Sequence, residues 1–336
     1  MARVKLRVTV QKLRLTAPFR ISGFVFQDQD VVLVELQEGE HRGRGEASGV
    51  YYLGDTAEKI VAAIETHRGE IEAGMGRGPL QQLLPPGGAR NALDCALWEL
   101  DASRAGQPVW QLAGLQPLIP LVTTFTLGAD DPAVMAEGAR KYSQAKSLKL
   151  KLTGDIALDI ARVRAVRAAR PGAWMGVDAN QGYTLDALSA LVDELILAEV
   201  SLLEQPLARG RESDLQGFSS PVPIAADESA LSLADLPGLV GRFDIVNIKL
   251  DKCGGLTEGL EMAREARALG LGVMVGNMVG TSLAMAPGLV VGQLCDVVDL
   301  DGPIFLSRDR TPGAIYTDGK IQCGEEVWGS GHSPAA

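Results

Sequence analysis

Carboxylates follow three consecutive short apolar segments in the second half of this 336-residue chain. Asp178 ends the segment WMGVD, Glu204 ends SLLE, and Asp227 follows PIAA. They are 26 and 23 residues apart, which is about the length of one strand–helix unit. Three carboxylates converging from neighbouring strands would repel one another without a cation. An all-oxygen ligand set suits a hard divalent ion, Mg²⁺ first and Mn²⁺ second.

A purely structural role for these acids stays open. A single carboxylate at a strand end is equally well explained as a helix N-cap or a surface ion pair. A series in phase with the strands is harder to explain in that way, because buried charges need partners. Glu228 and Asp251 each lie beside a candidate and are alternative ligands.

Lysines follow the same phase. Lys149 and Lys151 alternate with leucines in SLKLKL, so both point to one face of a strand. Two ammonium groups near a divalent cation disfavour each other's charge, which predicts a pKa lowered toward neutrality and a role as general base. Lys249 lies on the sixth apolar segment. In an eight-stranded barrel it would face the second strand across the mouth, a geometry that favours proton transfer between the two faces of one carbon, next to a carboxylate.

These side chains require a scaffold of alternating strands and helices. Eight apolar segments are spaced by helical patterns, which predicts an α/β fold with a parallel (β/α)8-type barrel, short of its last helix, over residues 119–302. The eight segments are residues 121–128, 147–152, 174–180, 200–206, 222–229, 243–250, 271–277 and 295–302. We expect residues 1–118 to form an α+β domain, and residues 303–336 to fold back onto it. In it we expect strands at 3–15 and 31–37, a loop from Pro18 to Asp30, and helices within 55–67 and 88–115.

Composition excludes several classes of protein. The net charge of −10 argues against nucleic-acid and membrane-surface binding. Apolar runs stay shorter than a membrane span, and the first residues lack the apolar core of a signal peptide, so we expect a cytoplasmic protein. Four separated cysteines do not indicate disulfides or zinc. The three histidines do not follow strand-like runs, so a Ser-His-Asp triad is not expected.

Taken together, the motifs resemble those of the enolase superfamily, specifically its muconate-lactonizing subgroup. The matching motifs are KLK at 149–151, VDAN at 177–180, LEQPL at 203–207, ADES at 226–229, NIKLDKCGGLTE at 247–258 and RNALDCALWELDA at 90–102. The resemblance covers nearly the whole chain. It implies an α+β capping domain over a modified (β/α)7β barrel, Mg²⁺ on the three carboxylates, and acid–base lysines at Lys151 and Lys249. It gives Lys149 the role of helping to bind the substrate carboxylate and of lowering the pKa of Lys151.

Within the subgroup, DLDGP at 299–303 resembles the dipeptide epimerase signature, and the motifs are most similar to those of the L-Ala-D/L-Glu epimerases. The resemblance implies that Asp299 and Asp301 bind the α-ammonium group of a dipeptide. Epimerases that select an acidic second residue carry an arginine in a mobile loop, whereas here that position falls near Phe26. A hydrophobic or cationic second residue is therefore expected, and so is a homo-oligomer. Further pocket residues expected are Phe24, Thr124, Asn277 and Met278.

Three alternative functions fit the same residues. A lyase or cycloisomerase of the same superfamily, such as o-succinylbenzoate synthase or muconate cycloisomerase, needs one basic lysine and does not require Asp299 and Asp301. An N-succinylamino acid racemase shares the two-lysine chemistry. A non-catalytic barrel that only binds its ligand is a third possibility, against which the complete set of acids and lysines argues.

Overall fold

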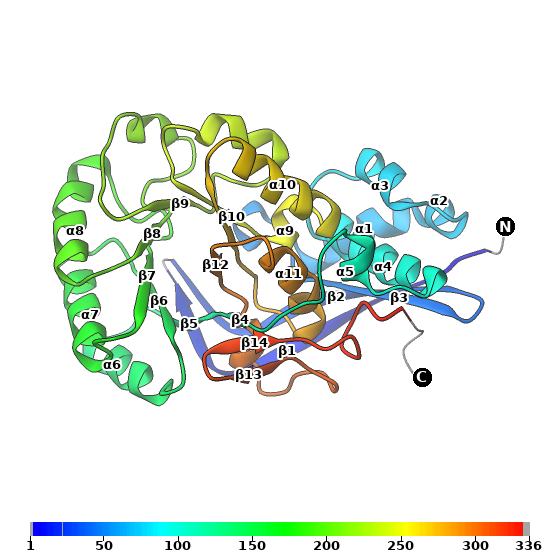
Figure 1. Ribbon diagram of the computed structural model, residues 1–336, viewed down its shortest axis with the longest axis horizontal. Coiled ribbons are helices and arrows are strands. Elements are labelled where there is room, and N and C mark those ends of the chain that lie inside the picture. Colours follow the sequence, from blue (N-terminus) through cyan, green and yellow to red (C-terminus); the bar gives the residue numbers. More distant parts are fainter. Residues whose placement is uncertain (1–2, 22, 332–336) are drawn as a thin grey trace.

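Residues 3–21 and 23–331 are described in a computed structural model, which joins a three-stranded antiparallel sheet to an eight-stranded parallel one (Figure 1). The antiparallel sheet consists of β1 (Lys5–Ile21), β2 (Phe24–Glu38) and β3 (His41–Ala47). The loop expected from Pro18 to Asp30 was a wrong prediction, since β1 and β2 continue as a hairpin that pairs Phe19 with Phe26. The pairing is interrupted around Pro18 and resumes after a register shift between Arg14 and Phe19. Gly23, near the turn, has a positive φ of 75°.

Helices cover one face of this sheet. They are α1 (Ala57–Thr66), α2 (Arg68–Glu72), α3 (Arg77–Leu83), α4 (Gly88–Ala105) and α5 (Val109–Leu112), preceded by the short 3₁₀ turn η1 (Tyr51–Leu53). Helix α4 packs very closely on β3. A Cβ atom on Gly43 or Gly45 would lie 2.0 Å from a carbonyl oxygen of α4, so only glycine permits this approach. The helix also contacts the barrel, where Trp98 donates to Thr257 over 2.9 Å. Helix α4 is therefore shared by the two parts.

Eight parallel strands form the barrel, in the order β12-β11-β10-β9-β8-β7-β6-β5. They are β5 (Thr124–Leu127), β6 (Ser147–Lys151), β7 (Trp174–Asp178), β8 (Leu202–Glu204), β9 (Ile224–Ala226), β10 (Ile245–Ile248), β11 (Gly272–Val275) and β12 (Val297–Val298). The predicted eight-stranded α/β barrel is thus confirmed. Its outer layer contains α6 (Pro132–Lys141), α7 (Ile156–Ala169), α8 (Leu185–Leu197), η2 (Glu212–Leu215), η3 (Leu233–Leu239), α10 (Leu256–Ala268) and α11 (Ser282–Gly292). The short helix α9 (Leu250–Cys253) is buried and contacts α4.

Side chains close the barrel between its two outermost strands, β5 and β12. The amide of Thr126 donates to Asp301 over 2.6 Å, and the amide of Leu300 donates to the hydroxyl of Thr123 over 3.0 Å. The hydroxyl of Thr124 donates to Asp299. Asp299 and Asp301 are therefore structural parts of this seam as well as candidate ligands for a substrate amine.

The last described segment contacts both parts of the molecule. After η4 (Gly302–Phe305), the hairpin β13 (Ile315–Thr317) and β14 (Lys320–Gln322) pairs with β4 (Leu121–Val122) beside the barrel. The chain then reaches the first part, where the indole of Trp328 donates to the carbonyl of Arg44 over 2.9 Å. Residues 332–336 of the expected return lie outside the described residues.

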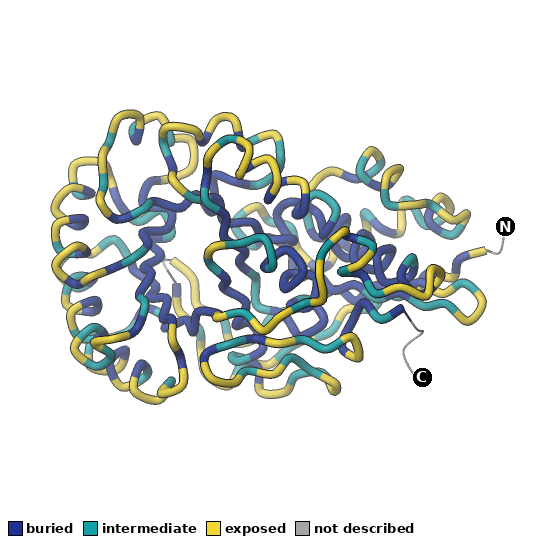
Figure 2. The backbone as a smooth tube through the Cα atoms, viewed as in Figure 1, coloured by how far each residue is buried: buried dark blue, intermediate teal, exposed yellow. Residues whose placement is uncertain are grey.

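Burial follows this arrangement. Figure 2 shows buried strands in the centre of the barrel and exposed outer faces on the surrounding helices. Within the described part of the chain, no helix is both long and apolar enough to cross a membrane. Several charged residues are buried inside the barrel, among them Lys149, Asp178 and Glu204. Because burying a charge costs free energy, these residues need a functional explanation.

Candidate active site

The ends of β7, β8 and β9 bring three buried carboxylates together. Ligand atoms of Asp178, Glu204 and Asp227 all lie within 4.8 Å of one another, and each residue is at most 1% exposed. Just after β7 and β8 the backbone has positive φ values, 42° at Asn180 and 37° at Gln205, a conformation that non-glycine residues rarely adopt. Such a compact, all-oxygen group fits a divalent metal ion.

Two lysines of β6 point into this group. Lys151 Nζ lies 2.6 Å from Asp178 Oδ2. Lys149 Nζ lies 2.7 Å from Glu204 Oε2 and 2.8 Å from Asp299 Oδ2. The intervening Leu148 and Leu150 are fully buried in the hydrophobic core, which explains why the lysines alternate with leucines. Lys149 therefore links the cluster to the barrel seam, and Lys151 lies at one side of the cluster.

Two further lysines approach from the other side. Lys249 Nζ lies 2.7 Å from Asp227 Oδ2. Lys252, on α9, donates to Asp227 Oδ1 and to the main-chain oxygen of Asp227, both at 2.6 Å, and to the carbonyl of Asn247 at 2.9 Å. Sequence reasoning missed Lys252. The available signal was a second lysine three residues after Lys249, inside the short helix that follows the strand.

The electrostatics differ from the sequence-based prediction. Burial lowers the pKa of Lys149, but the carboxylates of Asp299, Glu204 and Asp178 outweigh it and hold that pKa well above its ordinary value. Burial also lowers the pKa of Lys249, but the carboxylates of Asp227, Glu204 and Asp178 together outweigh it and raise that pKa above its ordinary value. The prediction considered repulsion between ammonium groups, whereas carboxylates dominate the immediate surroundings. A divalent cation on the same carboxylates would oppose this effect.

The two alternative ligands occupy other positions. Oε1 of Glu228 lies 3.5 Å from the side-chain amide nitrogen of Asn180. Burial and the nearby charge of Asp227 raise the pKa of Glu228 to about 8. Asp251 accepts hydrogen bonds from the backbone amides of Ser48 and Gly49. Neither residue belongs to the three-carboxylate group.

A pocket opens beside the carboxylates and lysines. Its lining residues are Phe19, Ile21, Phe26, Gln29, Gly49, Tyr51, Tyr52, Lys151, Asn180, Asp227, Glu228, Lys249, Asn277, Met278 and Val279. The lining mixes the candidate catalytic groups with an aromatic wall from the first part of the chain. Within the described residues, its only cationic side chains are Lys151 and Lys249, so the wall itself carries no positive charge.

The remaining predicted site residues lie in three places. Phe26 belongs to the aromatic wall, where its ring centroid is 5.3 Å from that of Tyr51. The ring centroid of Phe24 lies 4.8 Å from that of Tyr51, but Phe24 is exposed and does not line the pocket. Asn277 and Met278 line the pocket, as expected. Thr124, Asp299 and Asp301 lie together in the seam, and none of the three lines the pocket.

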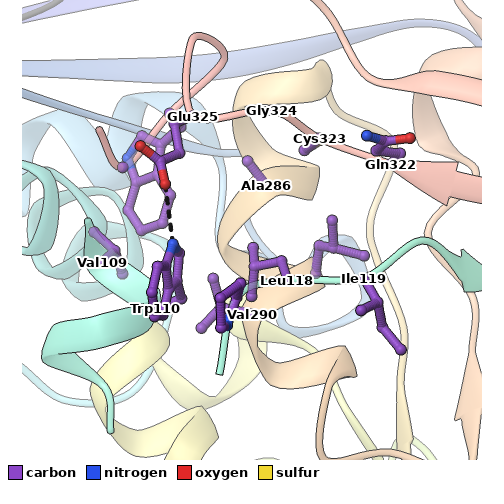
Figure 3. Close-up of a pocket in the computed structure, with 14 residues that line it drawn as sticks. Val109, Trp110, Leu118, Ile119, Ala286, Val290, Gln322, Cys323, Gly324 and Glu325 are labelled. Carbon is purple, nitrogen blue, oxygen red and sulfur yellow. Dashed lines mark hydrogen bonds between the residues drawn. The ribbon is translucent and has the colours of Figure 1, made fainter. Parts of the chain in front are cut away.

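A second hollow lies on another part of the molecule (Figure 3). It is formed by α5, residues 117–119, α11 and the segment after β14, and Trp110 donates to Glu325 across it over 3.0 Å. None of the predicted site residues lines it. Its walls are largely apolar, and the titratable side chains among its described lining residues are Cys323 and Glu325, which accepts from Trp110. The clustered carboxylates and lysines all lie in the barrel, so we place the chemistry in the barrel pocket.

Two family models match the chain. Residues 3–114 match the mandelate racemase/muconate lactonizing enzyme N-terminal domain, and residues 133–319 match the enolase C-terminal domain-like model. The L-Ala-D/L-Glu epimerase of Escherichia coli (strain K12) is 39% identical over 91% of this chain and 96% of its own. An N-acetyl-D-glutamate racemase of Pseudoalteromonas sp. is 40% identical over 74% and 79%. A hydrophobic dipeptide epimerase of Roseobacter litoralis is 35% identical over 91% and 92%.

Solved structures agree in fold. An enolase family member from Agrobacterium tumefaciens with homology to dipeptide epimerases, bound to sodium and L-Ala-L-Glu, superposes with a TM-score of 0.94. It is 41% identical over 97% of this chain and 100% of its own. A dipeptide epimerase from Methylococcus capsulatus complexed with Mg and L-Arg-D-Lys has a TM-score of 0.90 at 31% identity, over 96% and 98% of the two chains.

Proposed function

The chain belongs to the mandelate racemase/muconate lactonizing family of the enolase superfamily and is a dipeptide epimerase, and we propose that it inverts the second residue of L-Ala-L-X dipeptides by 1,1-proton transfer. One observation carries the proposal. Lys151 ends β6 and Lys249 directly follows β10, two strands that lie four apart in the sheet, and each lysine contacts a different carboxylate of one cluster. A substrate carbon between them would have one base on each face.

The reaction needs positive charge near the substrate carboxylate. Asp178, Glu204 and Asp227 would hold a divalent cation, and we propose Mg²⁺ because the ligands are all hard oxygens and because the Methylococcus structure contains Mg. When bound, the cation would supply positive charge that stabilises the enediolate formed as the α-proton leaves. Lys151 and Lys249 would take and return the proton, and Lys149 would face the substrate carboxylate.

We propose that the second residue is hydrophobic. Its side chain would meet the aromatic wall of Phe26 and Tyr51, and the described pocket lining has no arginine to pair with an acidic side chain. Arg20 of the same hairpin lies 3.5 Å from Asp130. The competing choice is glutamate, supported by the Escherichia coli relative and by the L-Ala-L-Glu in the Agrobacterium structure. Asp299 and Asp301 would bind the free amine of the first residue.

A second candidate is an N-acylamino acid racemase, which the Pseudoalteromonas relative favours. The same two lysines would serve that reaction. The two candidates differ at the amine, because an acylated substrate has no charge for Asp299 and Asp301 to bind. The cytoplasmic location and the homo-oligomer stay predictions from the sequence.

The test is incubation of the metal-loaded enzyme with a dipeptide library in D₂O, read by mass for α-proton exchange. Each dipeptide is paired with its N-acetylated form. We expect exchange in free dipeptides, reduced by roughly ten- to a hundredfold on acetylation, because a charge-assisted contact contributes about 1.5–3 kcal/mol. A preference for N-acylated amino acids over free dipeptides would instead support the racemase.

A further inference from the structure

We propose that Asp251 is a positioning residue that sets the aromatic wall of the pocket at a fixed distance from Lys249. The residue lies two positions after Lys249, in the first turn of α9. It is 7% exposed and is not one of the three clustered carboxylates. The part of the proposal that concerns substrate rests on the proposed function, in which the second side chain meets this wall.

The contacts of Asp251 run between the two parts of the molecule. Its Oδ1 accepts hydrogen bonds from the backbone amides of Ser48 at 2.9 Å and Gly49 at 3.0 Å, just after β3. The side chain of Asn91, on α4, also hydrogen-bonds to it. Burial raises its pKa to about 7, although these hydrogen bonds act in the opposite direction. One side chain of the barrel thus accepts hydrogen bonds from two adjacent backbone amides of the first part of the chain.

The turn at Ser48 and Gly49 depends on such a partner. Gly49 has a φ of 72°, and a Cβ atom there would lie 2.1 Å from the carbonyl oxygen of Asp55. The turn therefore requires glycine at this position and packs closely against Asp55. The two amides are buried, and leaving a buried donor without an acceptor typically costs about 1–3 kcal/mol. Ser48 adds a second tether, because its hydroxyl donates to the carbonyl of Val279 beside the pocket.

The aromatic wall begins directly after this turn. Val50 is 1% exposed, and Tyr51 and Tyr52 follow it into the pocket lining. The ring of Tyr51 packs against Phe26 and, at 5.1 Å, against Tyr52. A shift of the turn would therefore move the wall, whereas Lys249 would keep its contact with Asp227.

Because the wall would move while Lys249 stays in place, loss of Asp251 should affect dipeptides with a large second side chain more than those with a small one. Asp251→Ala should reduce kcat/KM for Ala-Phe by roughly tenfold or more, mainly through KM, because about 1.4 kcal/mol corresponds to tenfold. The second side chain of Ala-Ala is too small to contact the aromatic wall, so kcat/KM for Ala-Ala should fall by less than about threefold. Asp251→Asn keeps an oxygen that can accept from both amides, so it should retain the wild-type preference for Ala-Phe.

A matched control is available in Asp94. This buried carboxylate also joins the two parts, accepting from the backbone amide of Thr257 at 2.8 Å, but its hydrogen bonds go to Gln81 and Thr257 and not to the turn at Ser48 and Gly49. Asp94→Ala should change kcat/KM for Ala-Phe and Ala-Ala by the same factor. Amide hydrogen exchange of residues 48–53 should accelerate in Asp251→Ala and stay at the wild-type rate in Asp94→Ala.

Three results would each overturn the proposal. The first is an equal loss for the two dipeptides in Asp251→Ala, and the second is unchanged amide exchange in residues 48–53. The third is a loss of the Ala-Phe preference in Asp251→Asn as complete as in the alanine variant. If the wild type exchanges no dipeptide at all, the proposed function fails instead. The hydrogen-exchange comparison then still decides whether Asp251 holds the turn.

Discussion

Lys252 and Asp227 are joined by two contacts of 2.6 Å, one to a carboxylate oxygen and one to the main-chain oxygen of Asp227. Oδ1 of Asp227 is thereby occupied, and its Oδ2 lies toward Lys249. Lys252 itself is 2% exposed. Lys252, which also donates to the carbonyl of Asn247, therefore holds this carboxylate of the cluster in a single orientation.

Lys252→Met should destabilise the protein by up to about 3–5 kcal/mol, because it removes one of the two ammonium groups that neutralise the buried carboxylate of Asp227. Mg²⁺ should reduce that loss, since a bound cation compensates the charge of Asp227. Urea denaturation with and without Mg²⁺ measures both effects. Lys146→Met is the control, because its pair with Asp318 is solvent-exposed and should contribute less than about 1 kcal/mol. An equal loss with and without Mg²⁺ would contradict this interpretation.

Removal of one clustered carboxylate should weaken metal binding and turnover together. We expect Asp178→Asn to bind Mg²⁺ at least roughly tenfold more weakly by calorimetry, since a charged contact contributes about 1.5–3 kcal/mol. Glu228→Gln, a buried neighbour outside the cluster, should bind Mg²⁺ with nearly wild-type affinity. Full activity after exhaustive chelation would show that the cluster does not work through a cation.

The two lysines should fail in complementary ways. Lys151→Ala and Lys249→Ala should each reduce epimerisation by about 10²–10⁴-fold, the usual contribution of a positioned acid or base. In D₂O each variant should still exchange the α-proton of one stereoisomer, because the other base is intact. Mass spectrometry of separated L,L and L,D dipeptides distinguishes the two patterns. If both variants exchange the same isomer, the assignment of opposite faces is wrong.

The barrel was predictable because its signals are local and periodic. Lys149 and Lys151 alternate with buried leucines, and each candidate acid ends an apolar strand, so sequence spacing alone indicates which residues share the mouth. The hairpin from Phe19 to Phe26 was not predicted, because its pairing resumes after a register shift that leaves no regular alternation. The contact of Asp251 with Ser48 joins residues 203 positions apart, and no local pattern records such a pairing.

Asp94 should give stability a distinct pH dependence. Burial raises its pKa to about 6, against its hydrogen bonds with Thr257. The folded state therefore binds this proton more tightly than the unfolded chain, so the contribution of Asp94 to stability is greatest below about pH 4 and falls by roughly 3 kcal/mol as the pH rises through about 6. Asp94→Asn lacks this dependence. Unfolding free energies of both proteins between pH 4 and 7 give the difference, and a difference independent of pH would refute the assignment.

The side chain of the second residue should follow the chemistry of the aromatic wall. Burying an apolar side chain such as leucine or phenylalanine contributes about 1.5–3 kcal/mol, whereas a carboxylate against Phe26 and Tyr51 would lose its hydration without gaining a cationic partner. We expect kcat/KM for Ala-Leu and Ala-Phe to equal or exceed that for Ala-Glu. Phe26→Arg should shift the ratio toward Ala-Glu by about tenfold or more, because it supplies that partner. Val25→Arg adds the same charge at a neighbouring position that is 59% exposed and outside the pocket lining, and it should leave the ratio unchanged. A clear wild-type preference for Ala-Glu would show that the hairpin adopts a different position around the bound dipeptide, while the two-lysine chemistry would stand.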